Sequence, residues 1–324
     1  MTPHGLPAEE LAALEPLIAE IELLKRQRNA VVLAHNYMTP DIFHTVADIR
    51  GDSLALAQEG ARTDADVIVM AGVHFMAETA KILSPDKTVL IPDLRAGCSL
   101  ASSITAGDVL ALRAQHPGVP VVTYVNTTAA VKAVSDVCCT SANAVQVVES
   151  LGAPTVMLLP DRFLAANVAQ QTDVEIITCE TGACEVHERF TGVQIRGLRS
   201  NYPDGVAVVA HPECPTDVTA EADFVGSTSA MGRWLTANAP RRVALITECS
   251  MADNLAVDHP EIEWVKPCNL CPHMKRITLA GIRDALVSMQ HEVHVDDDVI
   301  TGARRALDRM LAVGRGESIA AAPR

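Results

Sequence analysis

Aromatic side chains are scarce in this chain of 324 residues: they make up 3% of it, whereas apolar residues of all kinds make up 48%. The core must therefore be filled by Val, Leu, Ile and Ala, which is typical of parallel sheets covered by helices on both faces. No stretch approaches the roughly 18 to 20 apolar residues of a membrane span, so we expect no association with a membrane. The composition predicts a soluble α/β protein.

Positive charge is also in deficit, because 26 Lys and Arg stand against 40 Asp and Glu, a formal net charge of −14. This balance argues against a general nucleic-acid-binding surface, which would have to neutralise phosphates, so an anionic substrate must be held by local groups. The N-terminal residues show no secretory leader pattern. Together with nine cysteines, this predicts a cytoplasmic protein whose thiols do chemistry rather than form disulfides.

Three of the cysteines recur at a regular interval. Cys98 and Cys184 are 86 residues apart, and Cys184 and Cys271 are 87 apart. Each follows an apolar run of strand length, at residues 88–92, 174–178 and 262–265. Such regular spacing indicates one structural module used three times. If the three modules pack around a common axis, their cysteines can meet at one point.

Apolar runs of strand length alternate with helical patterns in every module. The predicted strands cover residues 29–34, 66–70 and 88–92, then 119–125, 155–159 and 174–178, then 206–210, 243–247 and 262–265. A helix is expected before the first strand, and a closing helix at 296–311. The sequence thus predicts three pseudo-threefold-related αβα (Rossmann-like) domains with small parallel sheets around a central site. Their expected limits are 29–117, 118–204 and 205–290, between a helical segment at 1–28 and a C-terminal helix and tail at 291–324.

Polar residues follow the first strand and open the next helix at matching places in each module. His35, Tyr124 and His211 lie 63, 60 and 60 residues before their respective cysteines, and Ser53, Ser141 and Thr228 lie 45, 43 and 43 before them. Ligands bind at the carboxyl ends of parallel strands, and helix N-termini hold anions. The plainer alternatives are helix caps, with Asp52 as another candidate cap, and structural histidines. Glu213 is the best candidate general base, and Tyr37 and Asn126 supply further polar groups at strand ends.

Three thiolates that meet at one point can hold an iron-sulfur cluster and leave one iron open, where it acts as a Lewis acid. Cys98, Cys184 and Cys271 are the predicted ligands, with zinc binding or simple packing as the alternatives. Five further cysteines lack the repeat and are expected to be core or loop thiols, namely Cys138, Cys139, Cys179, Cys214 and Cys249. Cys268 is ambiguous, because Cys-x-x-Cys is also a redox and zinc motif.

The chain resembles the quinolinate synthase family from about residue 29 to about residue 290. The resemblance rests on Ala34-His35-Asn36-Tyr37, Gly51-Asp52-Ser53, residues 72–81 (GVHFMAETAK), residues 92–100 (PDLRAGCSL), residues 140–144 (TSANA), residues 182–187 (GACEVH), His211-Pro212-Glu213-Cys214, Gly226-Ser227-Thr228 and Cys271-Pro272-His273-Met274-Lys275. It implies a 4Fe-4S enzyme of NAD biosynthesis that condenses iminoaspartate with dihydroxyacetone phosphate to quinolinate, releasing phosphate and water.

The resemblance also assigns roles to residues. It implies that Cys98, Cys184 and Cys271 hold the cluster, that Tyr37 and Glu213 transfer protons, and that His35, Ser53, Tyr124, Asn126, Ser141, His211, Glu213 and Thr228 contact the substrates. We expect His35 and His211 to take part in catalysis. We further expect coupling to an enzyme that supplies iminoaspartate, and a homodimer.

Three positions depart from the family pattern. Met38 stands where a polar or aromatic residue is common, Cys179 stands where an aromatic residue is common, and Val265 stands where some relatives carry a further cysteine. The last departure argues that Cys268 and Cys271 do not form a cluster motif of their own. The alternatives are a cluster-dependent hydro-lyase, which would need one substrate, and a three-lobed redox-sensing or ligand-binding protein, which would need a fully ligated cluster.

Overall fold

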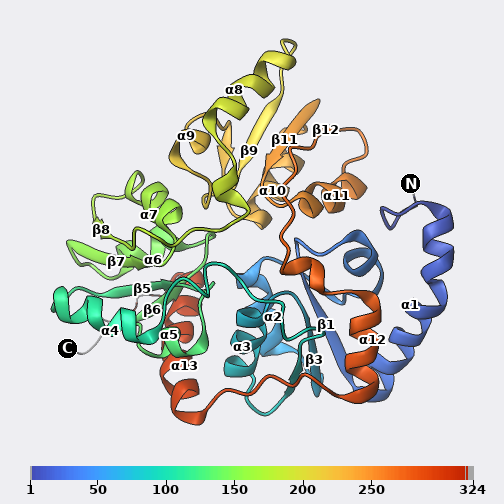
Figure 1. The fold of residues 1–324 in the computed structure, drawn as a ribbon, viewed down its shortest axis with the longest axis horizontal. Helices are drawn as coiled ribbons and strands as arrows, with labels where there is room; N and C mark the ends of the chain where they lie inside the picture. Colours follow the sequence, from blue (N-terminus) through green and yellow to red (C-terminus); the bar gives the residue numbers. More distant parts are fainter. Residues whose placement is uncertain (1, 318, 320–324) are drawn as a thin grey trace.

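The structure, a computed structural model, describes residues 2–317 and 319 and has three lobes (Figure 1). Each lobe contains one sheet of four parallel strands with helices packed around it. The first lobe comprises α1 (Ala8–Arg28), β1 (Ala30–His35), a π-helix (Ile42–Val46), β2 (Ile49–Gly51), α2 (Ser53–Arg62), β3 (Val67–Ala71), α3 (His74–Leu83) and β4 (Thr88–Leu90). The α/β fold with three small parallel sheets that the sequence predicts is confirmed.

The second and third lobes repeat this order of elements. The second comprises α4 (Ala106–Gln115), β5 (Val121–Tyr124), α5 (Ala129–Ala133), β6 (Val137–Cys139), α6 (Ala144–Ser150), β7 (Thr155–Leu159), α7 (Arg162–Ala169) and β8 (Glu175–Ile177). The third comprises α8 (Gly192–Asn201), β9 (Ala207–Ala210), α9 (Thr216–Thr219), β10 (Phe224–Val225), α10 (Thr228–Asn238), β11 (Arg242–Ile246), α11 (Cys249–Asp258) and β12 (Glu263–Val265).

The three sheets share one topology. Their strand orders are β2-β1-β3-β4, β6-β5-β7-β8 and β10-β9-β11-β12, and every pairing is parallel. The chain order therefore reverses direction beside the first strand of each sheet, which is where open α/β sheets bind ligands. The central strands are almost completely buried, as Val32 and Leu33 show in β1. Burial on both faces explains their continuous Val, Ile and Leu runs.

The sequence prediction of three strands in each lobe is wrong, because a fourth strand, β2, β6 or β10, lies at one edge of each sheet. These strands have three, three and two residues, too few for an apolar period to appear. An aspartate fixes each one, since its carboxylate accepts the backbone N–H of a first-strand residue. The pairs are Asp48 with Val32 (2.8 Å), Asp136 with Val121 (2.8 Å) and Asp223 with Val208 (2.7 Å).

A cation from the helix preceding the first strand completes each of these contacts. Lys25 lies 2.8 Å from Asp48, Arg113 lies 2.7 Å from Asp136, and Arg199 lies 3.0 Å from Asp223. Helices α1, α4 and α8 therefore occupy equivalent places. All twelve strands fall inside the predicted domain limits, although α4 and α8 precede the limits at 117 and 204. Those limits stay a prediction.

Two C-terminal helices tie the lobes together. Helix α12 (Leu279–Ser288) returns to the first lobe and packs against α1, and α13 (Asp297–Gly314) packs against α5, β6 and α3 (Figure 1). Helix α13 buries Ala303, Ala306, Leu307 and Met310 and so bridges the first two lobes. It matches the predicted closing helix, whereas the predicted loose tail at 320–324 lies outside the described residues. Among residues 2–317 and 319, no helix has the length and apolar character that a bilayer span requires.

Candidate active site

A cavity of about 70 Å³ lies where the three lobes meet. Residues at the carboxyl ends of β1, β5 and β9 line it, together with the starts of α2 and α10 and the turn before α6. All twelve residues that the sequence singled out line this cavity: His35, Tyr37, Ser53, Cys98, Tyr124, Asn126, Ser141, Cys184, His211, Glu213, Thr228 and Cys271. The structure therefore brings together groups that are up to 236 residues apart in the chain, from His35 to Cys271.

The three repeating cysteines sit in turns of one geometry. Each cysteine carbonyl accepts the N–H four residues later, with distances of 3.1 Å at Cys98, 3.0 Å at Cys184 and 3.2 Å at Cys271. Each sulfur is also approached by the backbone N–H groups two and three residues later, namely those of Leu100 and Ala101, Val186 and His187, and His273 and Met274. Backbone N–H groups directed at sulfur stabilise thiolates, so these turns fit a metal centre.

Burial raises the pKa of all three thiols, to about 12 at Cys98 and well above its usual value at Cys184. Neighbouring anions add to this, including Cys271 beside Cys98 and Cys98 beside Cys184. With pKa values raised in this way, the three thiols become thiolates only when a cation replaces their protons. The donor set therefore fits a metal group that is soft enough for thiolate ligands.

Polar contacts lock the three cysteine turns to one another. Ser99 Oγ donates to the Ala183 carbonyl at 3.3 Å and accepts the Glu185 N–H at 3.1 Å, which joins the first turn to the second. His273 Nε2 lies 3.0 Å from Glu185 Oε1, which joins the second turn to the third. The relative positions of the sulfurs are thus fixed by side chains next to them in sequence.

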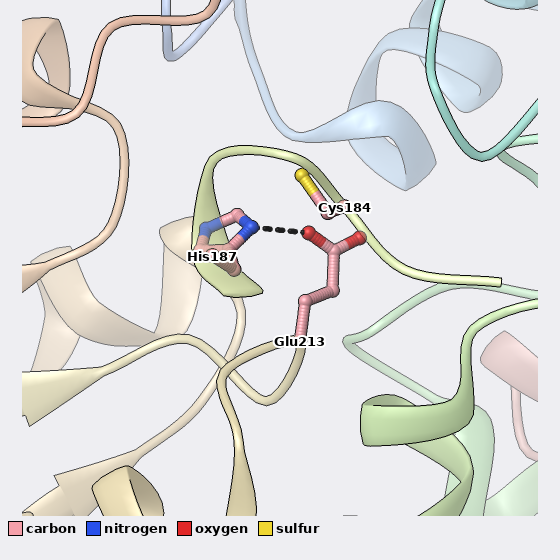
Figure 2. A group of neighbouring side chains, drawn as sticks. All are labelled: Cys184, His187 and Glu213. Atoms are coloured by element: carbon pink, nitrogen blue, oxygen red, sulfur yellow. Dashed lines mark ion pairs between the residues drawn. The ribbon is translucent and has the colours of Figure 1, made fainter. Parts of the chain in front are cut away.

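Glu213 lines the cavity, and its carboxylate points toward His187 and lies beside Cys184 (Figure 2). One carboxylate oxygen lies 2.7 Å from His187 Nδ1 and 3.4 Å from His211 Nδ1, and the other accepts a hydrogen bond of 3.3 Å from Asn126. Burial alone would raise the pKa of Glu213, but the two histidines outweigh burial and hold the pKa well below its usual value. Glu213 is therefore an ionised carboxylate in a buried site.

Cys184, His187 and Glu213 also form a group whose ligand atoms all lie within 4.8 Å of one another (Figure 2). This is a candidate metal-binding group of mixed donors. Both ring nitrogens of His187 are already engaged, however, because Nδ1 faces Glu213 and Nε2 lies 2.9 Å from Thr247 Oγ1. The thiolate is thus the member of the group whose donor atom faces no such partner.

A buried chain of contacts runs from Glu213 to Tyr37. His187 links Glu213 to the Thr247 hydroxyl, and that hydroxyl lies 2.6 Å from the Tyr37 hydroxyl. Burial, and then the charge of Glu213, raise the pKa of Tyr37 well above its usual value, so the phenol stays protonated. Burial likewise lowers the pKa of His187, which favours the neutral ring. This arrangement can move a proton without any group leaving the cavity.

The sequence reasoning did not select His187 or Thr247. Thr247 directly follows the buried strand β11, so it carries much the same signal as His35, which is the last residue of β1. His187 ends the motif at residues 182–187 that supports the family resemblance, but it follows no strand, so its position alone does not mark it as a site residue.

The polar residues at the helix starts are not the helix caps. Asp52 caps α2 by accepting the Ala55 N–H at 3.0 Å, and Ser227 caps α10 by accepting the Ala230 N–H at 3.3 Å. Ser53 and Thr228 come one residue later and line the cavity. The helix caps are therefore Asp52 and Ser227 and not Ser53 and Thr228. The hydroxyls of Ser53 and Thr228 lie beside free backbone N–H groups at the helix N-termini.

His35 and His211 have matching local roles. The Nδ1 atom of His35 accepts the Tyr37 N–H at 3.2 Å, and that of His211 accepts the Glu213 N–H at 3.4 Å. The contact at His35 leaves Nε2 as its ring donor, whereas His211 Nδ1 also faces the Glu213 carboxylate at 3.4 Å. Burial lowers the pKa of His35 to about 4, so its ring is neutral at pH 7.

The expectation that no disulfide forms is wrong, because Cys249 is bonded to Cys268. Cys249 opens α11 and is buried, and the loop after β12 brings Cys268 to it. Cys268 is therefore bonded to Cys249, whereas Cys271 is a free thiol. Cys138, Cys139 and Cys214 are buried free thiols, as expected, and Cys179 is a partly buried one.

Fold and site together define a class: three-lobed α/β enzymes with a buried acid–base cluster and a candidate thiolate metal centre on their central axis. The family described as Quinolinate synthetase A protein matches residues 19–312. This chain belongs to that family, and the sequence prediction of the family is confirmed. It is an enzyme of the quinolinate synthase type.

Relatives with this name are close in sequence. Quinolinate synthase 2 of Mesorhizobium japonicum is 65% identical over 308 residues, which cover 95% of this chain and 94% of the relative. Quinolinate synthase of Xylella fastidiosa is 64% identical over 290 residues, covering 90% and 85%, respectively. Quinolinate synthase of Agrobacterium fabrum is 61% identical over 308 residues, covering 95% and 89%.

Proposed function

We propose that this chain condenses iminoaspartate with dihydroxyacetone phosphate to form quinolinate, releasing phosphate and water, in the de novo synthesis of NAD. The observation that carries the proposal is the convergence of three equivalent cysteine turns on the cavity that also contains Glu213. Forming a pyridine ring from two acyclic compounds requires repeated proton transfers and dehydrations. The cavity offers an ionised carboxylate and a protonated phenol, which can take up and donate the protons that these steps require.

Cys98, Cys184 and Cys271 would hold a 4Fe-4S cluster, one thiolate from each lobe. When bound with three protein ligands, such a cluster supplies an open iron that acts as a Lewis acid toward a substrate oxygen or nitrogen. His187 and Glu213 would not bind the metal in this assignment, because His187 contacts Glu213 on one side and Thr247 on the other. Both residues therefore remain available for proton transfer.

The substrates would be held by neutral donors around this centre. The N-termini of α2 and α10 present backbone N–H groups beside Ser53 and Thr228, which suits carboxylate or phosphate oxygens. Tyr124, Asn126 and Ser141 line the second lobe's share of the cavity, His35 presents a ring N–H group and His211 a ring nitrogen. These neutral donors can bind two anionic substrates in a chain whose net charge is −14.

Glu213 would act as the general base and Tyr37 as a proton donor. Glu213 is ionised and can remove a proton from a carbon or nitrogen of the bound substrates. Tyr37 is protonated, and the Thr247 hydroxyl and His187 connect it to Glu213, so the proton taken up at one end can be returned at the other.

The direct test is an anaerobic assay of the iron-loaded protein with both substrates. We expect quinolinate and inorganic phosphate to form together in equal amounts, with no product when either substrate is left out. A hydro-lyase would instead convert a single substrate, so turnover of one substrate alone would contradict the proposal. The cytoplasmic location, the homodimer and the coupling to an iminoaspartate-supplying enzyme stay predictions.

Replacing Thr247 with Val should interrupt the contact between His187 and Tyr37. The change removes one hydroxyl, keeps the shape, and leaves two buried polar atoms without their partner. We expect turnover to fall by about 10-fold or more while the cluster content is unchanged. The measurement is the rate of quinolinate formation beside the iron content. Thr247→Ser restores the hydroxyl and should recover most of the rate, and equal rates in both variants would exclude the relay.

A further inference from the structure

A lysine and a glutamate outside the cavity lining form an ion pair beside the Cys271 turn. Lys275 Nζ lies 3.0 Å from Glu248 Oε1, and neither residue lines the cavity. The Glu248 side chain is completely buried, whereas that of Lys275 is 22% exposed. Burial raises the pKa of Glu248, and the charge of Lys275 opposes that rise. We call these two residues the Lys–Glu pair.

Glu248 connects the Lys–Glu pair to the Cys271 turn. Its Oε1 atom accepts the Cys271 N–H at 3.3 Å, and its Oε2 atom accepts the Ser250 N–H at 2.8 Å as the cap of α11. The Glu248 backbone also pairs with Asn269 in a parallel bridge. One buried carboxylate therefore holds the start of α11 against the segment that carries the third cysteine.

Lys275 connects the Lys–Glu pair to the first lobe. Its ammonium group donates to the Tyr37 carbonyl at 3.0 Å and to the Ser250 hydroxyl, in addition to contacting Glu248. An ammonium group has three N–H donors, so these three acceptors use all of them. Lys275 and Tyr37 are 238 residues apart in the chain. The pair thus joins the turn after β1 to the turn that holds Cys271.

Tyr37 is held by the third lobe at both of its ends. Its carbonyl is bound by Lys275, and the carbonyls on either side of it accept hydrogen bonds of 3.1 and 2.8 Å from Asn254 of α11. Its hydroxyl lies 2.6 Å from Thr247 Oγ1, and Thr247 directly precedes Glu248 in the chain. The backbone and the hydroxyl of Tyr37 are therefore fixed by the same part of the third lobe.

The other two cysteine turns form without such a pair. The residue four positions after the cysteine is Ser102 in the first lobe and Glu188 in the second, and both are exposed. Both turns nevertheless make the same carbonyl contact as the Cys271 turn, at 3.1 and 3.0 Å. The cysteine turn itself therefore does not need a Lys–Glu pair. This difference favours a role at the place that only this pair reaches, the turn of Tyr37.

We propose that Glu248 and Lys275 are positioning residues, which fix the backbone of Tyr37 to the third lobe and so hold its hydroxyl in place for proton transfer. The inference rests on the proposed function, in which Tyr37 donates a proton. Proton transfer requires donor and acceptor within hydrogen-bond reach, and a small displacement of a reacting group lowers the rate steeply.

A kinetic test separates positioning from general stability. Lys275→Met should lower kcat by about 10-fold and leave KM for both substrates unchanged, because Lys275 does not line the cavity. The same change in a Tyr37→Phe protein should cost less than about 2-fold, since no hydroxyl is left to position. An equal loss in both backgrounds would overturn the proposal. The matched control is Lys266→Met, which removes a half-exposed lysine paired with Asp253 of α11 and should keep normal kcat.

A second variant guards against loss of the fold. Lys275→Met leaves the buried Glu248 carboxylate without its cation, which can destabilise the protein. The double variant Glu248→Gln/Lys275→Met removes both charges, and the amide oxygen can still accept the Cys271 N–H. We expect it to keep its iron content and its thermal unfolding temperature and to show the same loss of kcat. A normal kcat in the double variant would overturn the proposal.

Amide hydrogen exchange tests the positioning without turnover. In the iron-loaded Lys275→Met protein, exchange at residues 36–38 should be about 10-fold faster than in the unaltered protein, whereas exchange at residues 124–126 of the second lobe should not change. Unchanged exchange at residues 36–38 would overturn the proposal. If the unaltered protein forms no quinolinate, the proposed function fails, while the exchange rates still decide whether Lys275 holds the Tyr37 turn.

Discussion

Cys184→Ser is expected to remove the iron-sulfur cluster and to reduce quinolinate formation below detection. A serine hydroxyl is not deprotonated at neutral pH and is a hard ligand, so it cannot replace a thiolate at iron. The turn itself should persist, because the backbone N–H groups that approach the sulfur belong to Val186 and His187. Iron and sulfide content, together with the visible absorption of anaerobic protein, measures the loss. Cys98→Ser and Cys271→Ser should behave alike, since each supplies one of three equivalent ligands.

The matched control for these variants is Cys268→Ser. Cys268 lies three residues from Cys271, but its sulfur is bonded to Cys249 and is thus not a candidate ligand. The variant should keep the cluster and most of the activity. Loss of iron in Cys268→Ser with retention in Cys271→Ser would reverse the assignment. Thermal unfolding of every variant should be measured, so that loss of metal is not confused with loss of fold.

The threefold plan could be predicted because two different signals repeat at the same interval. The cysteines recur every 86 to 87 residues, and each follows a buried strand whose apolar run is continuous. Such runs are long enough to be recognised without any tertiary information. Strands β2, β6 and β10 could not be found in this way, since two or three residues define no period. They form because Asp48, Asp136 and Asp223 fix them to their neighbours, a contact that involves another strand.

The residues of the candidate site also fall into two groups, those that the sequence could predict and those that it could not. Residues at the carboxyl ends of strands could be predicted, because the topology of a parallel sheet places them together whatever their side chains do. His187 could not, since its place depends on how the Cys184 turn packs beside Glu213. The disulfide was missed for a related reason. Cys249 and Cys268 are 19 residues apart with a helix and a strand between them, and only the loop after β12 brings them together.

Equivalent positions in the three lobes have become chemically different. His35, Tyr124 and His211 lie at the carboxyl ends of β1, β5 and β9, yet only in the third lobe does a carboxylate, Glu213, follow two residues later. The cysteines, by contrast, remain identical in type and in turn geometry. A metal centre on the axis needs the same ligand from each lobe, whereas proton transfer needs one base at one place. The three repeated modules therefore supply the three equivalent cysteines, whereas a difference between the modules at the end of the first strand supplies the single base, Glu213.

Glu213→Gln should lower turnover by roughly 10²-fold to 10⁴-fold, the range typical of general acid–base groups. The amide keeps the size of the side chain and can still accept the hydrogen bond from Asn126, but it cannot take a proton from the substrate. Cluster content should be preserved, because the proposed ligands are the three thiolates. Substrate binding should also persist, since the neutral donors at Ser53, Ser141 and Thr228 are unchanged.

The informative comparison is with Glu221→Gln, a carboxylate of the same lobe that pairs with Arg196 away from the cavity. This control removes one negative charge from the third lobe without touching the site, so it should keep normal turnover. Both variants are assayed anaerobically for quinolinate beside the cluster spectrum. Near-normal turnover in Glu213→Gln would remove Glu213 from the mechanism. Loss of the cluster in that variant would mean that the carboxylate acts through the metal centre, because a base that only moves protons has no reason to retain iron.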